Sequence, residues 1–370
     1  MKITWFSPHF ADGGVEKTIL LATQAFRNHG HQATLVSFNI NSSMLNTAPA
    51  GLRIIDLKTS RSLFSVVKFA RYLRKERPDA VISAQAYANI TAIAARKLSR
   101  VKTRLLVSER VATKQALEQE PRSKRLVISR LMKTLYGSAD IVGTNSQEGA
   151  NALAEFLNWE EQRVQSIYNP VNRPQIHELS HEPLNHEWLD QRTGPVILAA
   201  GRLTPQKDFQ TLLNALAVVN KSLECRLIIL GDGPERDRLK SHATELGISH
   251  LVDLHSSVSN PYSYMKAADL FVLSSRYEGM PNVLIEAQVC RTPIVSTACE
   301  TGPTELLLNG KAGQLVGIGD AAAMSVAILK ALQEPEFTTQ LEQVGFDHLD
   351  RFDPEQSYLN HIKAITGTLP

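Results

Sequence analysis

The 370-residue chain has few cysteines and no long apolar run. Its three cysteines, Cys225, Cys290 and Cys299, show neither paired nor C-x-x-C spacing, which argues against a disulfide framework or a structural zinc site and fits a reducing compartment. No apolar stretch approaches the ~18 residues of a membrane span, and the first residues lack the features of a secretory signal. We therefore expect a cytoplasmic protein that neither spans a membrane nor is secreted.

Two further absences concern cofactors. The chain has neither the G-x-x-x-x-G-K-[S/T] loop of P-loop proteins nor an Asp-x-Asp metal triplet. Gly231-Asp232-Gly233 begins like a dinucleotide fingerprint, but Arg236 stands where the third glycine belongs. We therefore expect no nicotinamide, flavin or other cofactor and no required metal. Any phosphate ligand would be neutralised by cationic side chains and helix N-termini.

What is present is a regular alternation of short apolar runs with helix-length segments. A chain of this length, with 43% hydrophobic residues, usually forms two cores. The alternation is typical of largely parallel sheets with helices on both faces, whose ligands bind at the carboxyl ends of the strands. The expected strands are Ile3–Phe6, Gln32–Ser37, Ala80–Ser83, Arg104–Val107, Asp140–Thr144 and Val164–Ile167, then Pro195–Ala199, Arg226–Leu230, Leu251–Leu254, Leu270–Leu273, Ile294–Ser296 and Gln314–Val316.

The alternation lapses in a polar stretch after Asn169, where two prolines block helix continuation. We therefore predict an α/β fold of two doubly wound, Rossmann-like domains, 1–170 and 195–353, joined by a linker over 171–194. A helical segment, 354–370, follows and could pack back on the first domain.

The net charge of +3 conceals an asymmetry between the two halves. Residues 1–170 hold 24 Lys and Arg against 13 Asp and Glu, whereas residues 171–370 hold 16 against 24. Many of the cations fall in Lys58–Arg77, where apolar residues recur at helical spacing from Leu63 to Leu73. This predicts a basic amphipathic helix, which either docks on an anionic membrane surface or packs on its own sheet with the basic face in solvent.

Two cations follow the first expected strand of the second half. Gly201 and Arg202 come directly after that strand, and Lys207 precedes a helix-length segment. Glycine allows a ligand to approach closely, Arg offers a fork of donors, Lys a point charge, and a helix start favours an anion. The pattern predicts a diphosphate site, although two solvated cations in a turn would look the same.

A second element follows the expected strand 270–273. It runs Glu278-Gly279-Met280-Pro281-Asn282-Val283 and reaches a second carboxylate at Glu286. Pro281 suits the first turn of a helix, so the free amides of that turn would face the strand ends, and Asn282 and Glu286 would share one face. Carboxylates accept hydrogen bonds from vicinal hydroxyls, which a nucleotide sugar carries on both its ribose and its hexose.

Together these elements resemble glycosyltransferase family four, whose members have the GT-B fold of two Rossmann-like domains facing each other across a cleft. The resemblance covers nearly the whole chain. It is carried, in order, by Gly13-Gly14-Val15-Glu16-Lys17, Ala139-Asp140-Ile141-Val142 with Asn145-Ser146, Tyr168-Asn169-Pro170-Val171, Gly201-Arg202 with Lys207, Gly231-Asp232-Gly233-Pro234, Ala268-Asp269 and the Glu278-to-Glu286 element.

The resemblance implies roles for individual residues. Arg202 and Lys207 would hold the diphosphate, Glu286 the ribose hydroxyls and Glu278 the donor sugar. Arg202, Lys207 and Glu278 are thus the main catalytic candidates. The other implied donor contacts are the residues around Glu278 (Gly279, Met280, Asn282 and Val283), the loop at Ser257 and Val258 facing the base, and Gly13 and Gly14 closing over the phosphates from the first domain.

The chain departs from the family at one place. Many members have a histidine near the reacting sugar, after the fourth strand of the first domain, whereas this chain reads Ser108-Glu109-Arg110 there. Retaining transfer in this fold is commonly described as front-face, with the leaving phosphate taking the acceptor's proton, so a protein base is not required. Glu109 and Arg110 are candidates for acceptor contact, or else form a strand-end ion pair. His9 could line the cleft or be structural.

The resemblance implies a retaining, metal-independent hexosyltransferase of surface polysaccharide or lipopolysaccharide biosynthesis. Its donor would be a nucleoside diphosphate sugar, with UDP-hexose or UDP-N-acetylhexosamine favoured, and its acceptor a glycan or a lipid-linked glycan. The charge asymmetry and the basic segment Lys58–Arg77, rather than the resemblance, favour a peripheral position on the inner face of the plasma membrane, and we expect no nucleic acid to bind. The alternatives are a non-catalytic nucleotide-sugar-binding paralogue and a GT-B-type epimerase or phosphorylase.

Overall fold

The structure, a computed structural model, describes residues 1–7, 10, 13–40, 48–49, 51–59 and 63–368. The chain divides into two compact units. Unit 1 comprises Met1–Val171 with Arg351–Pro370, and unit 2 comprises Asn172–Asp350. Each unit has its own sheet of parallel strands with helices, which confirms the predicted α/β class with two doubly wound domains.

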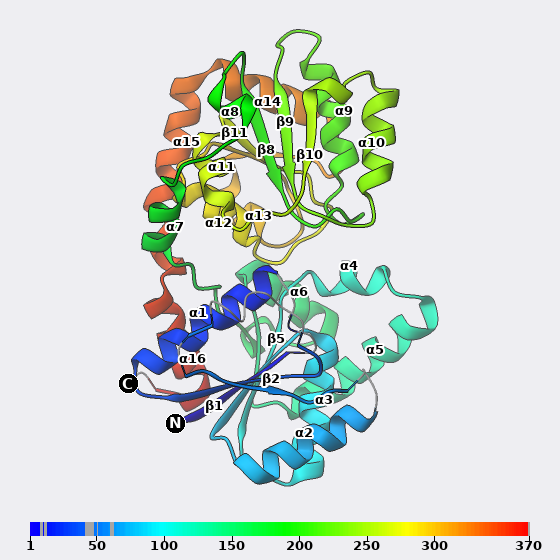
Figure 1. Cartoon of the computed structure of the whole chain (residues 1–370). Helices are drawn as coiled ribbons and strands as arrows, with labels where there is room; N and C mark the ends of the chain where they lie inside the picture. Colours follow the sequence, from blue (N-terminus) through cyan, green and yellow to red (C-terminus); the bar gives the residue numbers. More distant parts are fainter. Residues whose placement is uncertain (8–9, 11–12, 41–47, 50, 60–62, 369–370) are drawn as a thin grey trace. The chain divides into compact units, whose positions relative to one another are not determined.

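Unit 1 contains a seven-stranded sheet in the order β3-β2-β1-β4-β5-β6-β7, and its pairings are all parallel (Figure 1). The order runs outward from β1 to β3 and resumes on the other side of β1 at β4, so the topological switch point lies between the carboxyl ends of β1 and β4. The strands are β1 (Lys2–Ser7), β2 (Gln32–Ser37), β3 (Arg53–Asp56), β4 (Ala80–Ala84), β5 (Arg104–Glu109), β6 (Ile141–Thr144) and β7 (Val164–Ser166).

Strand β3 was not predicted from the sequence. It has four residues, none of them fully buried, and pairs only with β2 at the edge of the sheet. Its apolar content is Ile54-Ile55, flanked by Arg53 and Asp56. Such a pair carries too little periodicity to separate an edge strand from a loop.

Helices cover both faces of this sheet. On one face, α2, α3, α5 and α6 pack through core residues such as Phe69, Ile93, Met132 and Leu153. On the other face, α1 and α16 pack through residues such as Phe26 and Ile362. The helices are α1 (Gly14–Asn28), α2 (Leu63–Glu76), α3 (Ala86–Ser99), α4 (Thr113–Glu118), α5 (Arg122–Leu135), η2 (Tyr136–Ser138), α6 (Gln147–Leu157), η3 (Glu161–Arg163) and α16 (Pro354–Thr366).

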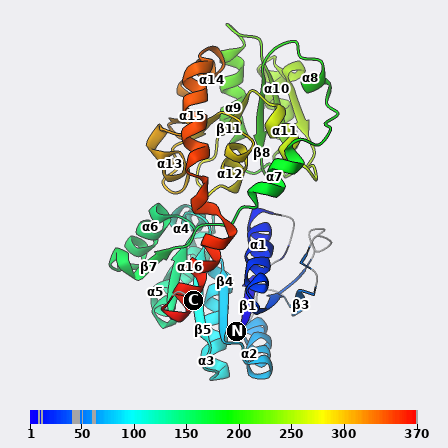
Figure 2. The same cartoon turned by 90° about the vertical axis from the view of Figure 1, so that its left-hand side faces the viewer.

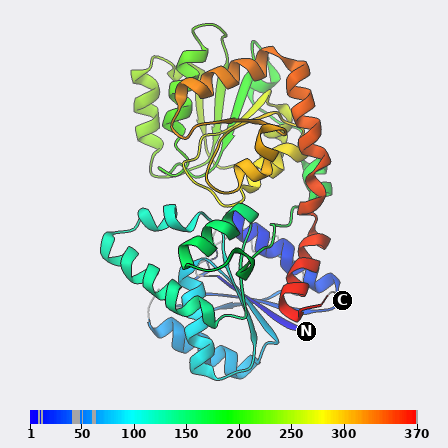
Figure 3. The same cartoon turned by 180° about the vertical axis from the view of Figure 1, so that it is seen from behind.

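The C-terminal helix α16 belongs to unit 1, where it lies against α1 (Figure 3). It starts after Asp353, whose carboxylate accepts a hydrogen bond from the Glu355 amide at 2.8 Å. The Tyr358 ring stacks on His29 with 3.8 Å between ring centroids, and His29 also contacts the Glu355 carboxylate at 2.8 Å. The apolar face of α16 therefore closes one side of the unit 1 core.

Unit 2 contains a six-stranded parallel sheet in the order β10-β9-β8-β11-β12-β13. Its switch point lies between the carboxyl ends of β8 and β11. The strands are β8 (Val196–Ala200), β9 (Arg226–Leu230), β10 (Val252–His255), β11 (Leu270–Leu273), β12 (Ile294–Thr297) and β13 (Gln314–Val316).

The main core of unit 2 lies between this sheet and the helices α9, α10 and α14. The helices of the unit are α7 (Arg173–Ser180), α8 (Glu187–Asp190), α9 (Phe209–Val219), α10 (Arg236–Glu245), η4 (Ser249–Leu251), α11 (Pro261–Ala267), α12 (Asn282–Val289), α13 (Pro303–Leu306), η5 (Leu308–Gly310), α14 (Ala321–Gln333) and α15 (Pro335–Asp347). A final turn, η6 (Leu349–Phe352), spans the boundary between the units.

The segment 171–194, predicted to be a linker, is instead largely part of unit 2. Helix α7 lies beside α11 (Figure 2), and the Asn260 side chain donates to the Leu179 carbonyl at 2.8 Å. Pro174 does not prevent this helix, because it stands in the first turn, where no backbone N–H is needed. The amide of Gln175 is satisfied by the capping side chain of Asn172 at 3.2 Å.

The two units share one contact at the start of a strand. In each unit, an aspartate that precedes one strand accepts a hydrogen bond from a backbone amide at the start of another strand. Asp140 accepts from the Leu105 amide at 2.8 Å, and Asp269 accepts from the Val196 amide at 2.8 Å. Two of the residues that carry the family resemblance therefore hold adjacent strands together.

Candidate active site

The loops after β8 and β11 meet at the switch point of unit 2. The Gln206 side chain donates to the Tyr277 carbonyl at 2.9 Å, and the Arg276 amide donates to the Gln206 carbonyl at 2.8 Å. The Ser274 hydroxyl donates to the Lys207 carbonyl at 2.8 Å. These bonds hold the two loops together, which brings Lys207 next to Glu278 although 71 residues separate them in sequence.

Lys207 and Glu278 form an ion pair that uses only one of the two carboxylate oxygens of Glu278. The Lys207 ammonium lies 2.5 Å from Glu278 Oε1, and the Ser275 hydroxyl donates to the same oxygen at 2.7 Å. Their side chains are 13% and 9% exposed, so both are largely shielded but still reachable. Within the described residues, no hydrogen bond or ion pair involves Glu278 Oε2. That oxygen is therefore available to accept from a ligand.

Two glycines allow this arrangement. Gly201 has φ +153°, and a Cβ there would lie 3.0 Å from Lys207 Cε, because the lysine stem crosses directly over it. Gly302 has φ +89°, and a Cβ there would lie 1.5 Å from the Gly279 carbonyl oxygen. The loop after β12 thus supports the backbone after Glu278, and Thr301 adds a hydrogen bond to the Glu278 carbonyl at 2.6 Å.

Sequence reasoning missed Ser275, Thr301 and Gly302. All three follow the carboxyl ends of parallel strands, β11 for the first and β12 for the other two. The strand-end rule that selected Glu278 could have selected them too, but small residues without charge carried no chemical signal of their own.

Arg202 lies in the loop after β8, at the same edge of the sheet. It is exposed, and within the described chain its side chain makes no hydrogen bond or ion pair. Burial raises the pKa of the neighbouring Tyr277 phenol, and the nearby Arg202 charge partly offsets this rise. Arg202 therefore remains free to bind an anion, beside the Lys207–Glu278 pair.

Asp232 ties the loops after β9 and β10 together. Its carboxylate accepts from the Ser257 amide at 2.8 Å and hydroxyl at 3.0 Å, and these bonds, with Arg236, lower the pKa of Asp232. Arg236 also donates to the Gly231 carbonyl at 2.7 Å, so it closes this loop where a dinucleotide fingerprint would have glycine. Ser257 is exposed and the next residue, Val258, is half-buried.

Gly231 and Gly233 serve packing between the same loops. A Cβ on Gly231 would lie 2.0 Å from the Gly201 carbonyl, and one on Gly233 would lie 2.4 Å from the Leu203 carbonyl. These glycines let the β9 loop lie directly on the β8 loop that carries Arg202 and Lys207.

Helix α12 begins at Asn282, one residue after the predicted Pro281, which takes the capping position. Gly279 and Met280 precede it, and the Met280 side chain is buried, so only its backbone can face a ligand. Asn282 and Glu286 are one turn apart, and Val283 is half-buried beside them. The Tyr262 hydroxyl of α11, another residue missed from the sequence, donates to Glu286 Oε1 at 3.4 Å.

Gly13 and Gly14 lie where unit 1 begins its first helix, after β1. Gly14 is the first residue of α1 and Gly13 its cap. A Cβ on Gly13 would lie 2.7 Å from a carboxylate oxygen of Glu16, so this side chain folds back over the helix start. His9, predicted to end the first strand, lies outside the described residues.

Glu109 and Arg110, at the end of β5, are both enclosed. Glu109 is 4% exposed and accepts hydrogen bonds from the Tyr136 hydroxyl and from the Asn89 side chain, the latter at 2.9 Å. Burial raises the pKa of Glu109 to about 7, although these hydrogen bonds oppose the shift. A buried carboxyl whose partners lie inside the core holds the local structure, and its predicted contact with an acceptor stays a prediction.

Arg110 has different partners. It is buried and donates to the Asn169 side chain at 2.8 Å, and its guanidinium lies 5.8 Å from the centre of the Trp5 ring. Burial lowers the pKa of Arg110 to about 10. Among the described residues no ion pair within 4.0 Å joins Glu109 to Arg110, although the charge of each residue acts on the pKa of the other.

Two family profiles match the chain. Residues 12–173 match the family described as Glycosyltransferase Family 4, and residues 183–347 match the family described as Glycosyl transferases group 1. The chain belongs to glycosyltransferase family four. This confirms the resemblance found in the sequence.

Individual relatives of this glycosyltransferase support the same conclusion. The amylovoran biosynthesis glycosyltransferase AmsD of Erwinia amylovora is 28% identical over 346 residues, which is 93% of each chain. The N-acetylgalactosamine-N,N'-diacetylbacillosaminyl-diphospho-undecaprenol 4-alpha-N-acetylgalactosaminyltransferase of Campylobacter jejuni is 26% identical over 72% of this chain and 70% of its own. Among solved structures, Anabaena HepE in complex with UDP-glucose has a TM-score of 0.81 at 19% identity, with 100% of both chains covered, and shares the GT-B fold.

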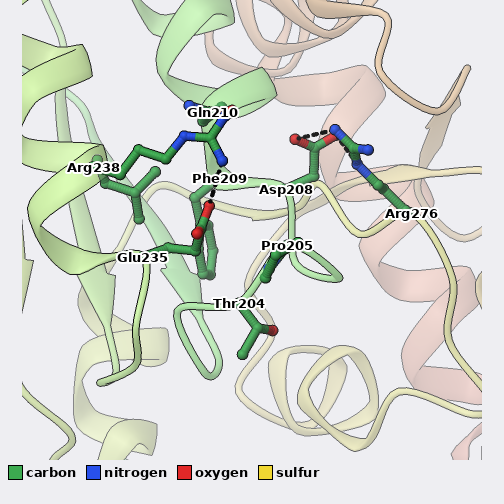
Figure 4. Close-up of a pocket in the computed structure, with 9 residues that line it drawn as sticks. Thr204, Pro205, Asp208, Phe209, Gln210, Glu235, Arg238 and Arg276 are labelled. Atoms are coloured by element: carbon green, nitrogen blue, oxygen red, sulfur yellow. Dashed lines mark hydrogen bonds and ion pairs between the residues drawn. The ribbon is translucent and has the colours of Figure 1, made fainter. Parts of the chain in front are cut away.

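A separate pocket of the glycosyltransferase lies beside the β8 loop (Figure 4). Its charged groups are paired, Arg276 with Asp208 at 3.1 Å and Arg238 with Glu235 at 3.2 Å. Neither Lys207 nor Glu278 lines it. The pocket therefore lies beside the start of α9, where Asp208 is the capping residue with φ +47°, and the Lys207–Glu278 pair is not part of it. Within the described ranges, no three His, Cys, Asp or Glu side chains gather as metal ligands would.

The basic segment Lys58–Arg77 of the glycosyltransferase forms α2 over most of its length, with Arg61 outside the described residues. Lys68 donates to the Leu57 carbonyl at 2.8 Å, and Arg74 to the Leu98 carbonyl at 2.6 Å. Two of the cations predicted to face a membrane are thus bound to backbone carbonyls of unit 1. Among the described helices, none is both long and apolar enough to cross a bilayer.

Proposed function

We propose that this glycosyltransferase is a retaining, metal-independent enzyme that moves a hexose or N-acetylhexosamine from UDP to a glycan or a lipid-linked glycan. The observation that carries the proposal is the Lys207–Glu278 pair at the switch point of unit 2, with Glu278 Oε2 left open beside a lysine that has further N–H donors. A cation next to an unused carboxylate oxygen suits a ligand that joins a phosphate to a sugar hydroxyl.

The diphosphate would bind Arg202, Lys207 and the first amides of α12. Arg202 is exposed, and Lys207 uses one donor on Glu278 and keeps others. These groups would supply positive charge where the leaving diphosphate gains negative charge, and Lys207 is already held in place by its ion pair with Glu278. The donor sugar would place a hydroxyl on Glu278 Oε2, and Glu286 would accept from the ribose.

The transfer would follow from this alignment. The acceptor oxygen bonds to the anomeric carbon on the face from which UDP departs, the bond from that carbon to the phosphate oxygen breaks, and the acceptor's proton passes to the leaving phosphate. The protein contributes orientation and charge stabilisation, so no protein base is needed. The enclosed position of Glu109 is consistent with a reaction that does not use it as a base.

The nature of the acceptor is supported by the relatives. The names of the Erwinia and Campylobacter enzymes refer to amylovoran biosynthesis and to a diphospho-undecaprenol acceptor. We propose that this chain likewise works on a membrane-presented glycan, from a peripheral position on the cytoplasmic membrane surface.

Calorimetry with UDP tests the donor site. Wild type should bind UDP with chelator present, and the double variant Arg202→Ala, Lys207→Ala should bind about 10²- to 10⁴-fold more weakly, because each charge-assisted contact contributes about 1.5–3 kcal/mol. The matched control, Lys221→Ala with Lys240→Ala, removes two exposed cations of the same unit and should bind like wild type.

Three results would count against the proposal. If the Arg202→Ala, Lys207→Ala variant bound UDP as tightly as the Lys221→Ala, Lys240→Ala control, Arg202 and Lys207 would not be part of the donor site. Binding that disappears with chelator would show a metal requirement. A product whose anomeric configuration is inverted relative to the donor, read by NMR, would exclude the retaining mechanism.

A further inference from the structure

Helix α5 of unit 1 exposes apolar side chains that nothing in the described chain covers. Leu126 is 62% exposed, Val127 59% and Leu131 37%. The opposite face of the helix packs inward through Met132, which is buried, and Ile128. The helix therefore has two apolar faces, one in the core and one in solvent.

The charges on α5 are all of one sign. The helix Arg122–Leu135 has five cations and no carboxylate, and the cations are Arg122, Lys124, Arg125, Arg130 and Lys133. Lys124 pairs with Glu120, just before the helix, at 2.6 Å, and the Lys133 ammonium lies 5.2 Å from the Phe156 ring centre. Arg122 and Arg130 are exposed and, within the described chain, make no side-chain hydrogen bond or ion pair.

An exposed apolar strip flanked by unpaired cations matches an anionic lipid surface. The apolar side chains fit between lipid headgroups, and the cations attract the negative charge around them. A soluble acidic protein would satisfy the cations, but it would not need three exposed aliphatic side chains within six residues.

Helix α5 fits this role better than α2. The exposed apolar residues of α2, Phe64 and Val67, are accompanied by Lys68 and Arg74, which donate to backbone carbonyls and so support the fold. On the described part of α2 two apolar side chains are exposed, Phe64 (75%) and Val67 (38%), against three on α5, and the remaining exposed cations of α2 include Arg71 and Lys75.

We propose that α5 is the element by which this protein docks on an anionic membrane. This inference deepens the proposed function, because it names the surface that would meet a membrane-presented acceptor. The short helix α4 connects the carboxyl end of β5 to α5, and the two project together to one side of unit 1 (Figure 1). Docking through α5 thus keeps the lipid surface close to the strand ends of unit 1.

Vesicle co-sedimentation tests the assignment. Wild type at low salt should bind vesicles of phosphatidylglycerol with phosphatidylcholine, and should bind pure phosphatidylcholine much less. The variant Arg122→Glu, Arg130→Glu should bind the anionic vesicles about a hundred-fold or more weakly, because two charge reversals change four charges near the surface. The matched control on α2, Arg71→Glu with Lys75→Glu, should stay within a few-fold of wild type.

A second variant tests whether the exposed apolar side chains of α5 contribute to vesicle binding. Leu126→Ser with Val127→Ser keeps every cation, so its binding should weaken while the salt dependence stays like that of wild type. Far-UV circular dichroism and the melting temperature establish that each variant is folded, and the exposed positions should leave both unchanged.

Several results would overturn the proposal. Wild type that stays in the supernatant at low salt would exclude membrane docking, and equal losses on α2 and α5 would reduce the effect to net charge. Unchanged binding by both α5 variants would exclude this helix. UDP calorimetry on the same preparations separates the two proposals, because vesicle binding can fail while the donor site still binds UDP, and the reverse.

Discussion

The two sheets of this glycosyltransferase place charged residues at comparable strand ends, yet they use them differently. In unit 2, Lys207 and Glu278 pair across the switch point and leave a carboxylate oxygen open, with Arg202 exposed beside them. In unit 1, Glu109 ends β5 and Arg110 follows it, but both are buried among side chains of their own unit. The same topology thus supports an open site in one unit and an enclosed polar cluster in the other.

The difference lies in what surrounds each strand end. In unit 2 the neighbours are small or glycine, namely Gly201, Ser275 and Gly302, so backbone loops approach closely around the Lys207–Glu278 pair, which is shielded but keeps one carboxylate oxygen unbonded. In unit 1 the neighbours of Glu109 and Arg110 are large, Tyr136 and Trp5. Bulky side chains seal a strand end, whereas small ones leave room for a ligand. The predictions that follow test this contrast.

The largest effect is expected for Gly302→Ala. A Cβ there would lie 1.5 Å from the Gly279 carbonyl oxygen, so the loop after β12 must move away from the loop after β11 that carries Glu278. We expect a loss of more than about 4 kcal/mol in the free energy of unfolding, measured by urea denaturation, or failure to fold. Gly310→Ala is the control, because Gly310 has φ +91° but nothing near its Cβ. Gly310→Ala should lower the free energy of unfolding by only about 1–2 kcal/mol, from backbone strain. If the two variants lost equal stability, the contact between the two loops at Gly302 would not be what makes that glycine necessary.

The next largest effects are expected from two variants that distinguish the roles of the Glu278 and Glu286 carboxylates. Glu278→Gln should lower turnover about 10²- to 10³-fold, because an amide nitrogen replaces one acceptor oxygen and the stabilising charge is lost. UDP affinity should hold or rise, since Lys207 is no longer offset by a carboxylate. Glu286→Gln should instead weaken UDP about tenfold.

Calorimetry and initial rates on the same samples check this division, with the exposed Glu245→Gln as the control. If Glu278→Gln and Glu286→Gln lost UDP binding equally and kept the same turnover at saturation, the division of roles would be wrong.

The buried carboxyl of Glu109 in unit 1 predicts that the stability of the protein depends on pH. The folded pKa of Glu109, about 7, lies above that of an unfolded glutamate, so its stabilising contribution is complete below about pH 4.5 and is lost as pH rises through 7. Relative to Glu109→Gln, wild type should lose about 3 kcal/mol of unfolding free energy between pH 4.5 and 8. Urea denaturation across this range measures it. The exposed Glu118→Gln should parallel wild type, and parallel curves for Glu109→Gln would show that this carboxyl is not enclosed.

The smallest effect is expected for Tyr262→Phe. Its hydroxyl donates to Glu286 at 3.4 Å, a long bond, so its loss should weaken UDP only about two- to five-fold through a less well oriented carboxylate. Tyr264→Phe, on the same helix, removes a hydroxyl that contacts His255 at 3.1 Å and should leave UDP affinity unchanged. Equal calorimetric affinities for the two variants would mean that Tyr262 does not orient Glu286.

Much of the architecture could be read from local patterns. The apolar runs at Arg226–Leu230 and Leu270–Leu273 were predicted with the bounds that the structure has, because a strand buried on both faces must be continuously apolar. The strand β3 and the helix α7 were missed, since an edge strand needs few apolar residues and a proline near a helix start reads like a helix break.

The sequence by itself determined the two β/α alternations, and through the strand-end rule it located Arg202, Lys207, Glu278 and Glu286 at one edge of one sheet. Only the tertiary structure decided that Lys207 and Glu278 pair, that Ser275 takes the second bond on the same oxygen, and that Glu109 is enclosed. The reason is physical: strand periodicity is local and is written in neighbouring residues. Which charges are paired, shielded or open depends on side chains that packing brings together from distant parts of the chain.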